Sequence, residues 1–204
     1  AGVGDLEIVD GAVRIVGTDK ALDLAAIAAL PGATTAMLRV HQSWQPPEAT
    51  YPNGTHVCEL EIDPATGNTE ILNYVVVDDF GVTLNPIMLT GQVHGGAGQG
   101  IGQALMEEIK FDSSGQMLTA TFMDYALPRA IDIPNFHFET RNVRCVTNAI
   151  GVKGAGEAGA IGACPAVMNA MVDALNRAAG IKAIDMPATP VKVFNALKSA
   201  GYPL

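Results

Sequence analysis

The sequence predicts an α+β fold in which helices pack on a mixed, largely antiparallel sheet. Segments that alternate apolar and polar residues come in neighbouring pairs joined by short turns, which indicates antiparallel hairpins. Apolar residues at helical spacing occur in separate segments, most clearly near the C-terminal end. Strands and helices do not alternate strictly along the chain, as they would in a parallel α/β fold.

Length, composition and charge limit the class of protein. The chain has 204 residues, of which 49% are hydrophobic and 16% charged, so it can bury a core. A net charge of −9 without a basic cluster disfavours nucleic acid and anionic membranes as partners. The sequence suggests neither a membrane span nor a signal peptide. We expect a cytoplasmic globular protein whose three cysteines are reduced thiols.

The first expected elements are a hairpin and a short helix. Residues 5–17 alternate on either side of Asp10-Gly11, a dipeptide that suits the positive φ angles of a tight turn. Residues 20–32 carry apolar residues at helical spacing and end at Pro31-Gly32, which predicts a short amphipathic helix.

A strand over 34–40 and a polar segment follow. The segment near 41–53 is rich in Pro, Ser, Thr and Asn, which is typical of a loop or linker. We therefore expect residues 1–204 to form one folding unit, with a minor subdivision near 41–53.

The clearest hairpin pairs residues 57–63 with residues 69–79. In the turn between them, Pro64 fixes φ and Gly67 accepts a left-handed conformation. A helix over 101–109 and a return strand over 117–122 are expected next.

Two helices end the chain. Pro165 suits a first helical position and Gly180 suits the stop of the first of these helices. Thr189 is the expected cap of the last helix, with Pro190 in its first turn.

Two glycine-rich segments, 91–108 and 151–165, are the candidate functional regions. Glycines before a helix let the backbone approach a ligand, and the free amides of the first turn favour an anion, so a phosphorylated cofactor is expected. The residues suited to bind it are Gln92, Gly95, Gly96, Lys153, Gly154 and Gly156. Gly154, Gly156 and Gly159 also match the GxGxxG pattern of nucleotide-binding Rossmann proteins, but Glu157 between them would repel a pyrophosphate.

Glu157 has two interpretations. It is either a charge stabilised in the first turn of a helix or a general acid–base group projecting from a glycine-lined turn. Lys153, four residues earlier, could hold Glu157 ionised or meet a cofactor phosphate. The sequence does not choose between these alternatives.

An ordered series of segments resembles the C-terminal part of the large subunit of molybdenum hydroxylases, the family of xanthine dehydrogenase, aldehyde oxidase and aerobic carbon monoxide dehydrogenase. The series is YPNGTHVCELEIDPATG, VVVDDFGVTLNP, GQVHGGAGQGIGQALMEE, DYALPRAIDIP, GVKGAGEAGAIGACPAVMNAMVDAL and IDMPATPVKVFNAL. The family often has cysteine at Phe80 and proline at Ala149, positions to which we assign no chemistry.

The resemblance implies the molybdopterin-binding domain fold of this family and assigns roles to two residues. Glu157 falls on the catalytic glutamate, and Gln92 on a glutamine that contacts the molybdopterin-type molybdenum cofactor, for which the cytosine dinucleotide form is a candidate. The implied reaction hydroxylates an aldehyde, an N-heterocycle or carbon monoxide with oxygen from water, and the glutamate removes a proton.

The resemblance also implies partners. The N-terminal half of the large subunit, an iron–sulfur subunit or domain and an FAD subunit or domain would complete the enzyme around a small-molecule substrate. We expect the chain to bind cofactor only together with the missing half and to be inactive alone. A non-catalytic module of the same fold, acting in cofactor assembly or as a scaffold, is the alternative.

Overall fold

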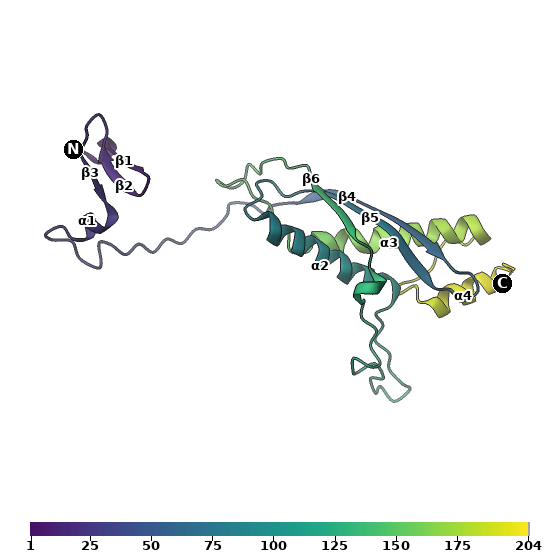
Figure 1. The fold of residues 1–204 in the computed structure, drawn as a ribbon. Helices are drawn as coiled ribbons and strands as arrows, with labels where there is room; N and C mark the ends of the chain where they lie inside the picture. The colour runs from purple at the N-terminus through teal and green to yellow at the C-terminus, as the bar shows by residue number, and fades with distance from the viewer. Residues whose placement is uncertain (204) are drawn as a thin grey trace. The chain divides into compact units, whose positions relative to one another are not determined.

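The computed structural model describes residues 1–203 and contains two compact units, Ala1–Gln45 and Pro46–Leu204 (Figure 1). The boundary between the two units lies in the polar segment near 41–53, where the sequence suggests a subdivision of one folding unit. Each unit is built around its own three-stranded sheet.

The first unit is a small antiparallel sheet with one short helix. It contains the 3-10 turn Val3–Asp5, the strands β1 (Leu6–Val9), β2 (Ala12–Ile15) and β3 (Ala21–Asp23), and the helix α1 (Leu24–Ala28). The predicted hairpin at Asp10-Gly11 is confirmed, with φ of 50° and 77° at these residues. The predicted helix is shorter than expected, because residues 21–23 pair with β2 instead. No residue of this unit is fully buried.

The second unit contains the long hairpin β4 (Asn53–Ile62) and β5 (Thr69–Asp79), and β6 (Phe136–Thr140) pairs in parallel with β5. The turn at Gly67 has a φ of 75°, as predicted. Burial alternates along β4, so the period-two pattern of the sequence corresponds to one face toward the core and one face outward. The mixed sheet confirms the α+β prediction.

Two long helices pack on each other and on this sheet (Figure 1). The helix α2 spans Pro86–Leu105, α3 spans Ala158–Ala179, and α4 (Pro190–Ser199) follows near the C-terminal end. The core brings together residues from β5, the three helices and the chain around them, among them Tyr74, Val76, Phe80, Val93, Ala97, Ile101, Val167, Met171, Leu175, Val193 and Leu197.

Close packing of α2 on α3 depends on glycine. A Cβ atom added at Gly159 would lie 2.4 Å from the Val93 carbonyl oxygen, and one at Gly100 would lie 2.6 Å from the Ala163 Cβ. The backbones of the two helices therefore approach more closely than side chains would allow.

Several predicted boundaries are wrong. The glycines of 91–102 do not precede a helix but lie within α2, which begins at Pro86 because the Asn85 side chain accepts a hydrogen bond from the Met88 amide at 3.1 Å. Likewise α3 begins at Ala158, so Pro165 lies inside it rather than at its first position. The stop at Gly180 and the last helix with its Thr189 cap are confirmed.

Two expected strands do not form. Residues 34–40 make turns, and residues 117–122 contain only an isolated bridge between Met117 and Phe111. The predicted helix beyond the glycines ends at Leu105, before Ile109.

The helix α3 also meets the length and hydropathy of a membrane span, with 22 residues and a mean hydropathy of 1.4. Its apolar stripe, however, buries Val167, Met171 and Leu175 in the core against the sheet and α2, as a core helix does.

Candidate functional site

Glu157 is the N-cap residue of α3. Its φ of −120° and ψ of −1° are not helical, its carbonyl oxygen accepts the Ile161 amide at 3.0 Å, and its side chain makes no capping hydrogen bond. The side chain is exposed. The carboxylate is therefore not used to cap the helix and remains available at the start of α3, where the helix dipole stabilises negative charge.

The packing of α2 on α3 places Gln92 beside this turn. Its Nε2 donates to the Gly156 carbonyl oxygen at 3.3 Å, a contact between residues 64 positions apart in sequence. The two glycine-rich segments thus meet at this turn. The rest of the Gln92 carboxamide is exposed and keeps donor and acceptor capacity for a ligand.

The predicted glycines differ in what surrounds them. An added Cβ at Gly95 or Gly156 would meet no atom within 4 Å, so a ligand could approach the backbone at both positions. Gly96 packs against α3, where an added Cβ would lie 3.0 Å from the Ala160 amide nitrogen. The Gly154 amide donates to the Thr50 hydroxyl at 3.1 Å.

Lys153 forms a buried ion pair with Asp79, not with Glu157. Its Nζ lies 2.6 Å from Asp79 Oδ2, and the two side chains are 12% and 9% exposed. Burial alone would raise the pKa of Asp79, but hydrogen bonds from Lys153 and from the Val143 and Gly81 amides outweigh it and lower the pKa to about 2. The carboxylate is therefore ionised at neutral pH, and its charge compensates the lysine.

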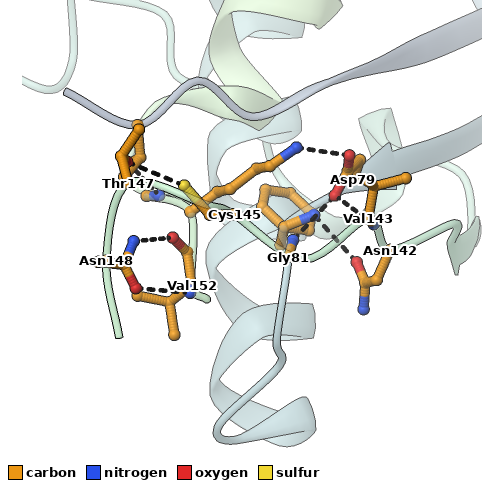
Figure 2. A network of polar contacts seen from close by, with 12 residues as sticks. Asp79, Gly81, Asn142, Val143, Cys145, Thr147, Asn148 and Val152 are labelled. Carbon is orange, nitrogen blue, oxygen red and sulfur yellow. Dashed lines mark hydrogen bonds and ion pairs between the residues drawn. The ribbon is translucent and has the colours of Figure 1, made fainter. Parts of the chain in front are cut away.

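This ion pair belongs to a network that fixes the chain leading to Glu157 (Figure 2). The Lys153 amide donates to the Phe80 carbonyl oxygen at 2.9 Å, which ties it to the end of β5. The Asn148 side chain accepts the Gly151 amide at 2.6 Å and donates to the Val152 carbonyl oxygen at 2.9 Å. Gly151 itself adopts a φ of 76°. Hydrogen bonds from both side chains and backbone therefore fix residues 151–153, which lead into the turn before Glu157.

A cavity of about 430 Å³ lies beside Glu157. Its wall includes Gly156 and Ile161 from the turn and α3, and His56 and Asp78 from the two long strands. His56, Asp78 and Asp79 were not predicted as site residues from the sequence. An acidic pair at the end of the apolar run Val75–Val77 could have marked the last two, because carboxylates are rarely buried without partners.

His94 lies against aromatic rings and not in a metal-binding group. Its ring centroid is 5.2 Å from that of Phe136 and 6.3 Å from that of Phe138. Within residues 1–203, no three His, Cys, Asp or Glu side chains are grouped to hold a metal ion. The site instead presents an exposed carboxamide, accessible backbone at two glycines and an exposed carboxylate, groups that can contact a polar ligand.

The chain matches the family model described as the molybdopterin cofactor-binding domain over residues 1–134. It is similar to the gamma subunit of the 6-hydroxypseudooxynicotine dehydrogenase complex of Paenarthrobacter nicotinovorans, with 36% identity over 94% of this chain and 25% of that subunit. The carbon monoxide dehydrogenase large chain of Hydrogenophaga pseudoflava is 36% identical over 76% of this chain and 19% of that protein.

Solved enzyme structures are also similar to this chain. A Cu,Mo-CO dehydrogenase covers 97% of this chain with a TM-score of 0.83 and 30% identity, and 26% of that chain is matched. The quinoline 2-oxidoreductase of Pseudomonas putida 86 covers 100% of this chain with a TM-score of 0.83 and 31% identity, and 27% of that chain is matched. The chain thus spans at most about a quarter of the curated relatives named above.

Proposed function

The chain belongs to the molybdenum hydroxylase family, as part of its molybdopterin cofactor-binding domain, and from this premise we propose that it binds the molybdenum cofactor and supplies Glu157 as the base of a hydroxylation. One observation carries the proposal. The free carboxylate of Glu157 is adjacent in the chain to Gly156, whose carbonyl oxygen Gln92 contacts. A base and a ligand-binding amide from distant segments therefore meet at one helix start.

Gln92 and the backbone at Gly95 and Gly156 are the proposed cofactor contacts. An added Cβ at either glycine would meet no atom within 4 Å, and the exposed Gln92 carboxamide keeps donor and acceptor capacity. Gly96, Lys153 and Gly154 support the same site by holding α2, the turn and the Asp79 pair in place, since their own groups are already engaged. A molybdopterin cofactor, with the cytosine dinucleotide as the proposed nucleotide form, supplies two-electron redox chemistry when bound.

Glu157 is proposed to remove a proton from the water-derived group that attacks the substrate. A general base must come within about 3 Å of that proton's oxygen, and an exposed side chain beside a cavity can do so. The glycines around it leave room for the carboxylate to adjust. An aldehyde, an N-heterocycle or carbon monoxide is the proposed substrate class, and the names of the relatives include carbon monoxide, nicotine and quinoline enzymes.

The active enzyme is proposed to need further parts. The first unit buries none of its residues fully, and its sheet has no core of its own. The N-terminal half of a large subunit would complete the cofactor site, and iron–sulfur and FAD subunits or domains would take the electrons. The assembly is proposed to be cytoplasmic, and this chain alone is proposed to be inactive.

Metal and pterin analysis tests this proposal. We expect the chain expressed with the rest of its large subunit to carry molybdenum and pterin in equal amounts, measured by elemental analysis and mass spectrometry. Gln92→Ala is expected to lower that content, while Gln99→Ala, an exposed residue of the same helix, keeps it. A stable, fully assembled complex free of molybdenum would favour the non-catalytic module instead.

A further inference from the structure

Three buried polar side chains lie beneath the first turns of α3 and have no part in the proposed reaction. They are Tyr74 and Asp78 on β5 and His56 on the neighbouring strand β4. The Tyr74 hydroxyl is 2.8 Å from His56 Nδ1, and His56 Nε2 is 3.6 Å from Asp78 Oδ2. Tyr74 is fully buried, and the side chains of His56 and Asp78 are 6% and 4% exposed. Polar side chains that are this deeply buried are uncommon, so these three call for a structural or functional explanation.

The chemistry of the three groups orients the imidazole. Burial, and then the neighbouring Cys58, Asp78 and Cys164, raise the pKa of Tyr74, so its hydroxyl keeps its proton and can donate to His56 Nδ1. The imidazole proton then lies on Nε2, the edge that faces Asp78. Within the part of the chain that the structure describes, Asp78 Oδ2 has no hydrogen bond, so His56 is the group that faces this oxygen. The ring is thus hydrogen-bonded to Tyr74 at one edge and faces the Asp78 carboxylate at 3.6 Å at the other.

The backbone of α3 rests directly on this ring. An added Cβ at Gly162 would lie 2.5 Å from His56 Cε1 and Nε2, whereas real Cβ atoms do not come so close. Gly162 follows Ile161, whose amide donates to the Glu157 carbonyl oxygen. His56, Gly162 and Glu157 also line the same cavity. The imidazole therefore sets how far the first turns of α3 stand from the sheet.

We propose that His56, oriented by Tyr74 and Asp78, is a positioning residue that holds the start of α3 and thereby places the Glu157 carboxylate. The inference rests on the proposed function of Glu157 as the base. A displacement of about 1 Å at a reacting group can cost about 100-fold in rate, so a small shift of this turn is enough to be measured.

A pair of complementary variants tests the proposal in the assembled enzyme. His56→Ala removes the ring beneath Gly162, and Gly162→Ala pushes a methyl group into the ring. Each is expected to lower kcat about 10- to 100-fold, with KM and molybdenum content near those of the native enzyme. The double variant places the new methyl group at position 162 in the space left by the ring, and its kcat is expected to exceed that of either single variant.

Tyr74→Phe provides a milder test that keeps the core filled. It removes only the hydroxyl that orients the ring, so a fall in kcat of about three- to tenfold is expected at unchanged molybdenum content, equivalent to the loss of about one hydrogen bond. This variant is informative even where His56→Ala yields no folded enzyme.

The inference would be overturned by unchanged kcat in both His56→Ala and Tyr74→Phe, or by a double variant whose loss is the product of the single losses. A loss of kcat that only follows molybdenum content would also overturn it, because the residues would then serve folding alone. Glu157→Gln separates the two proposals. If it is inactive while the His56 and Tyr74 variants are normal, only the positioning role fails; if it is fully active, the role of Glu157 itself fails.

Discussion

The two glycine-rich segments look alike in sequence and have different roles in the structure. In α2 the glycines at 96 and 100 let a second helix approach, while Gly95 leaves the backbone open. In residues 151–157 of the second segment, Gly151 adopts a positive φ, and side-chain and backbone hydrogen bonds tie the chain to β5. The first segment and the part of the second that lies in α3 are therefore held by helix packing, whereas residues 151–157 are held by a polar network. Glycine density alone does not reveal which role applies.

The largest expected effect on stability comes from breaking the anchor of the second segment. Lys153→Met leaves the buried Asp79 carboxylate without its cation, and loss of one partner of a buried pair costs about 3–5 kcal/mol. Chemical unfolding followed by circular dichroism measures this loss of unfolding free energy. Lys182→Met, at an exposed lysine, should stay within about 0.5 kcal/mol of the native chain. A Lys153→Met chain as stable as this control would mean that the pair does not hold the turn.

Acid should weaken the same anchor. The folded-state pKa of Asp79 lies below that of an unfolded chain, so its contribution to stability is complete above about pH 4 and is lost as the pH falls toward about 2. Hydrogen bonds also lower the pKa of exposed carboxyls such as Asp63 and Asp112, so the native chain carries more than one acid-sensitive group. The unfolding free energy of Asp79→Asn measured across this range should therefore fall less steeply than that of the native chain, and equal slopes would contradict the assignment.

Substitution at the helix crossing should destabilise less than loss of the ion pair. Gly159→Ala puts a methyl group 2.4 Å from the Val93 carbonyl oxygen and 2.7 Å from the Ala97 amide nitrogen, both backbone atoms. The helices must separate, and overpacking of this kind costs about 1–3 kcal/mol. Thermal unfolding of the chain tests it, and a melting temperature equal to that of the native protein would argue against close packing here.

The smallest expected effect has the opposite sign. Gly91 lies inside α2, and an added Cβ there would meet nothing within 4 Å. Gly91→Ala should therefore stabilise the chain by about 0.5–1 kcal/mol through helix propensity alone. The same unfolding experiment as for Gly159 compares one helical glycine from each glycine-rich segment. Destabilisation by Gly91→Ala would show that the helix packs against something at this position.

Features with local signals were predictable from the sequence. The turns at Asp10-Gly11 and Gly67 need positive φ angles, and their residue types indicate this need. The alternation of apolar and polar residues along β4 and β5 was also readable, because only one face of these strands is turned toward the core. The start of α2 could have been found from Asn85-Pro86, a cap followed by a first-turn proline, but the glycines after it resemble a loop.

Features that depend on distant partners were not predictable. Asp79 and Lys153 are 74 residues apart, so the sequence offered Lys153 only the nearby Glu157 or a phosphate as a partner. The strand β6 is short and pairs in parallel with a strand much earlier in the chain. Residues 34–40 show the opposite error, because a strand was predicted there and none forms. They have apolar residues such as Met37 and Leu38, which are 74% and 52% exposed, but no strand beside them to pair with.

The candidate site was predictable in part. Glu157 and Gln92 were predicted as site residues by resemblance, and the structure brings their segments together through the packing of α2 on α3. His56 was not identified, because an alternating strand gives no indication of which of its inward residues will lie beside a helix start. Asp78 was not identified either, although its place in an acidic pair after Val75–Val77 was a usable signal.

Turnover of Glu157→Gln is the most direct test of the proposed role of Glu157 as the base. The variant keeps the shape of the side chain and removes its basicity, so the complete enzyme should fold, retain molybdenum and pterin, and lose about 10²- to 10⁴-fold in kcat. Glu108→Gln, on a carboxylate bonded to Lys110, is the matched control and should keep its kcat. Native kcat in Glu157→Gln at full molybdenum content would contradict the role of Glu157 as the base.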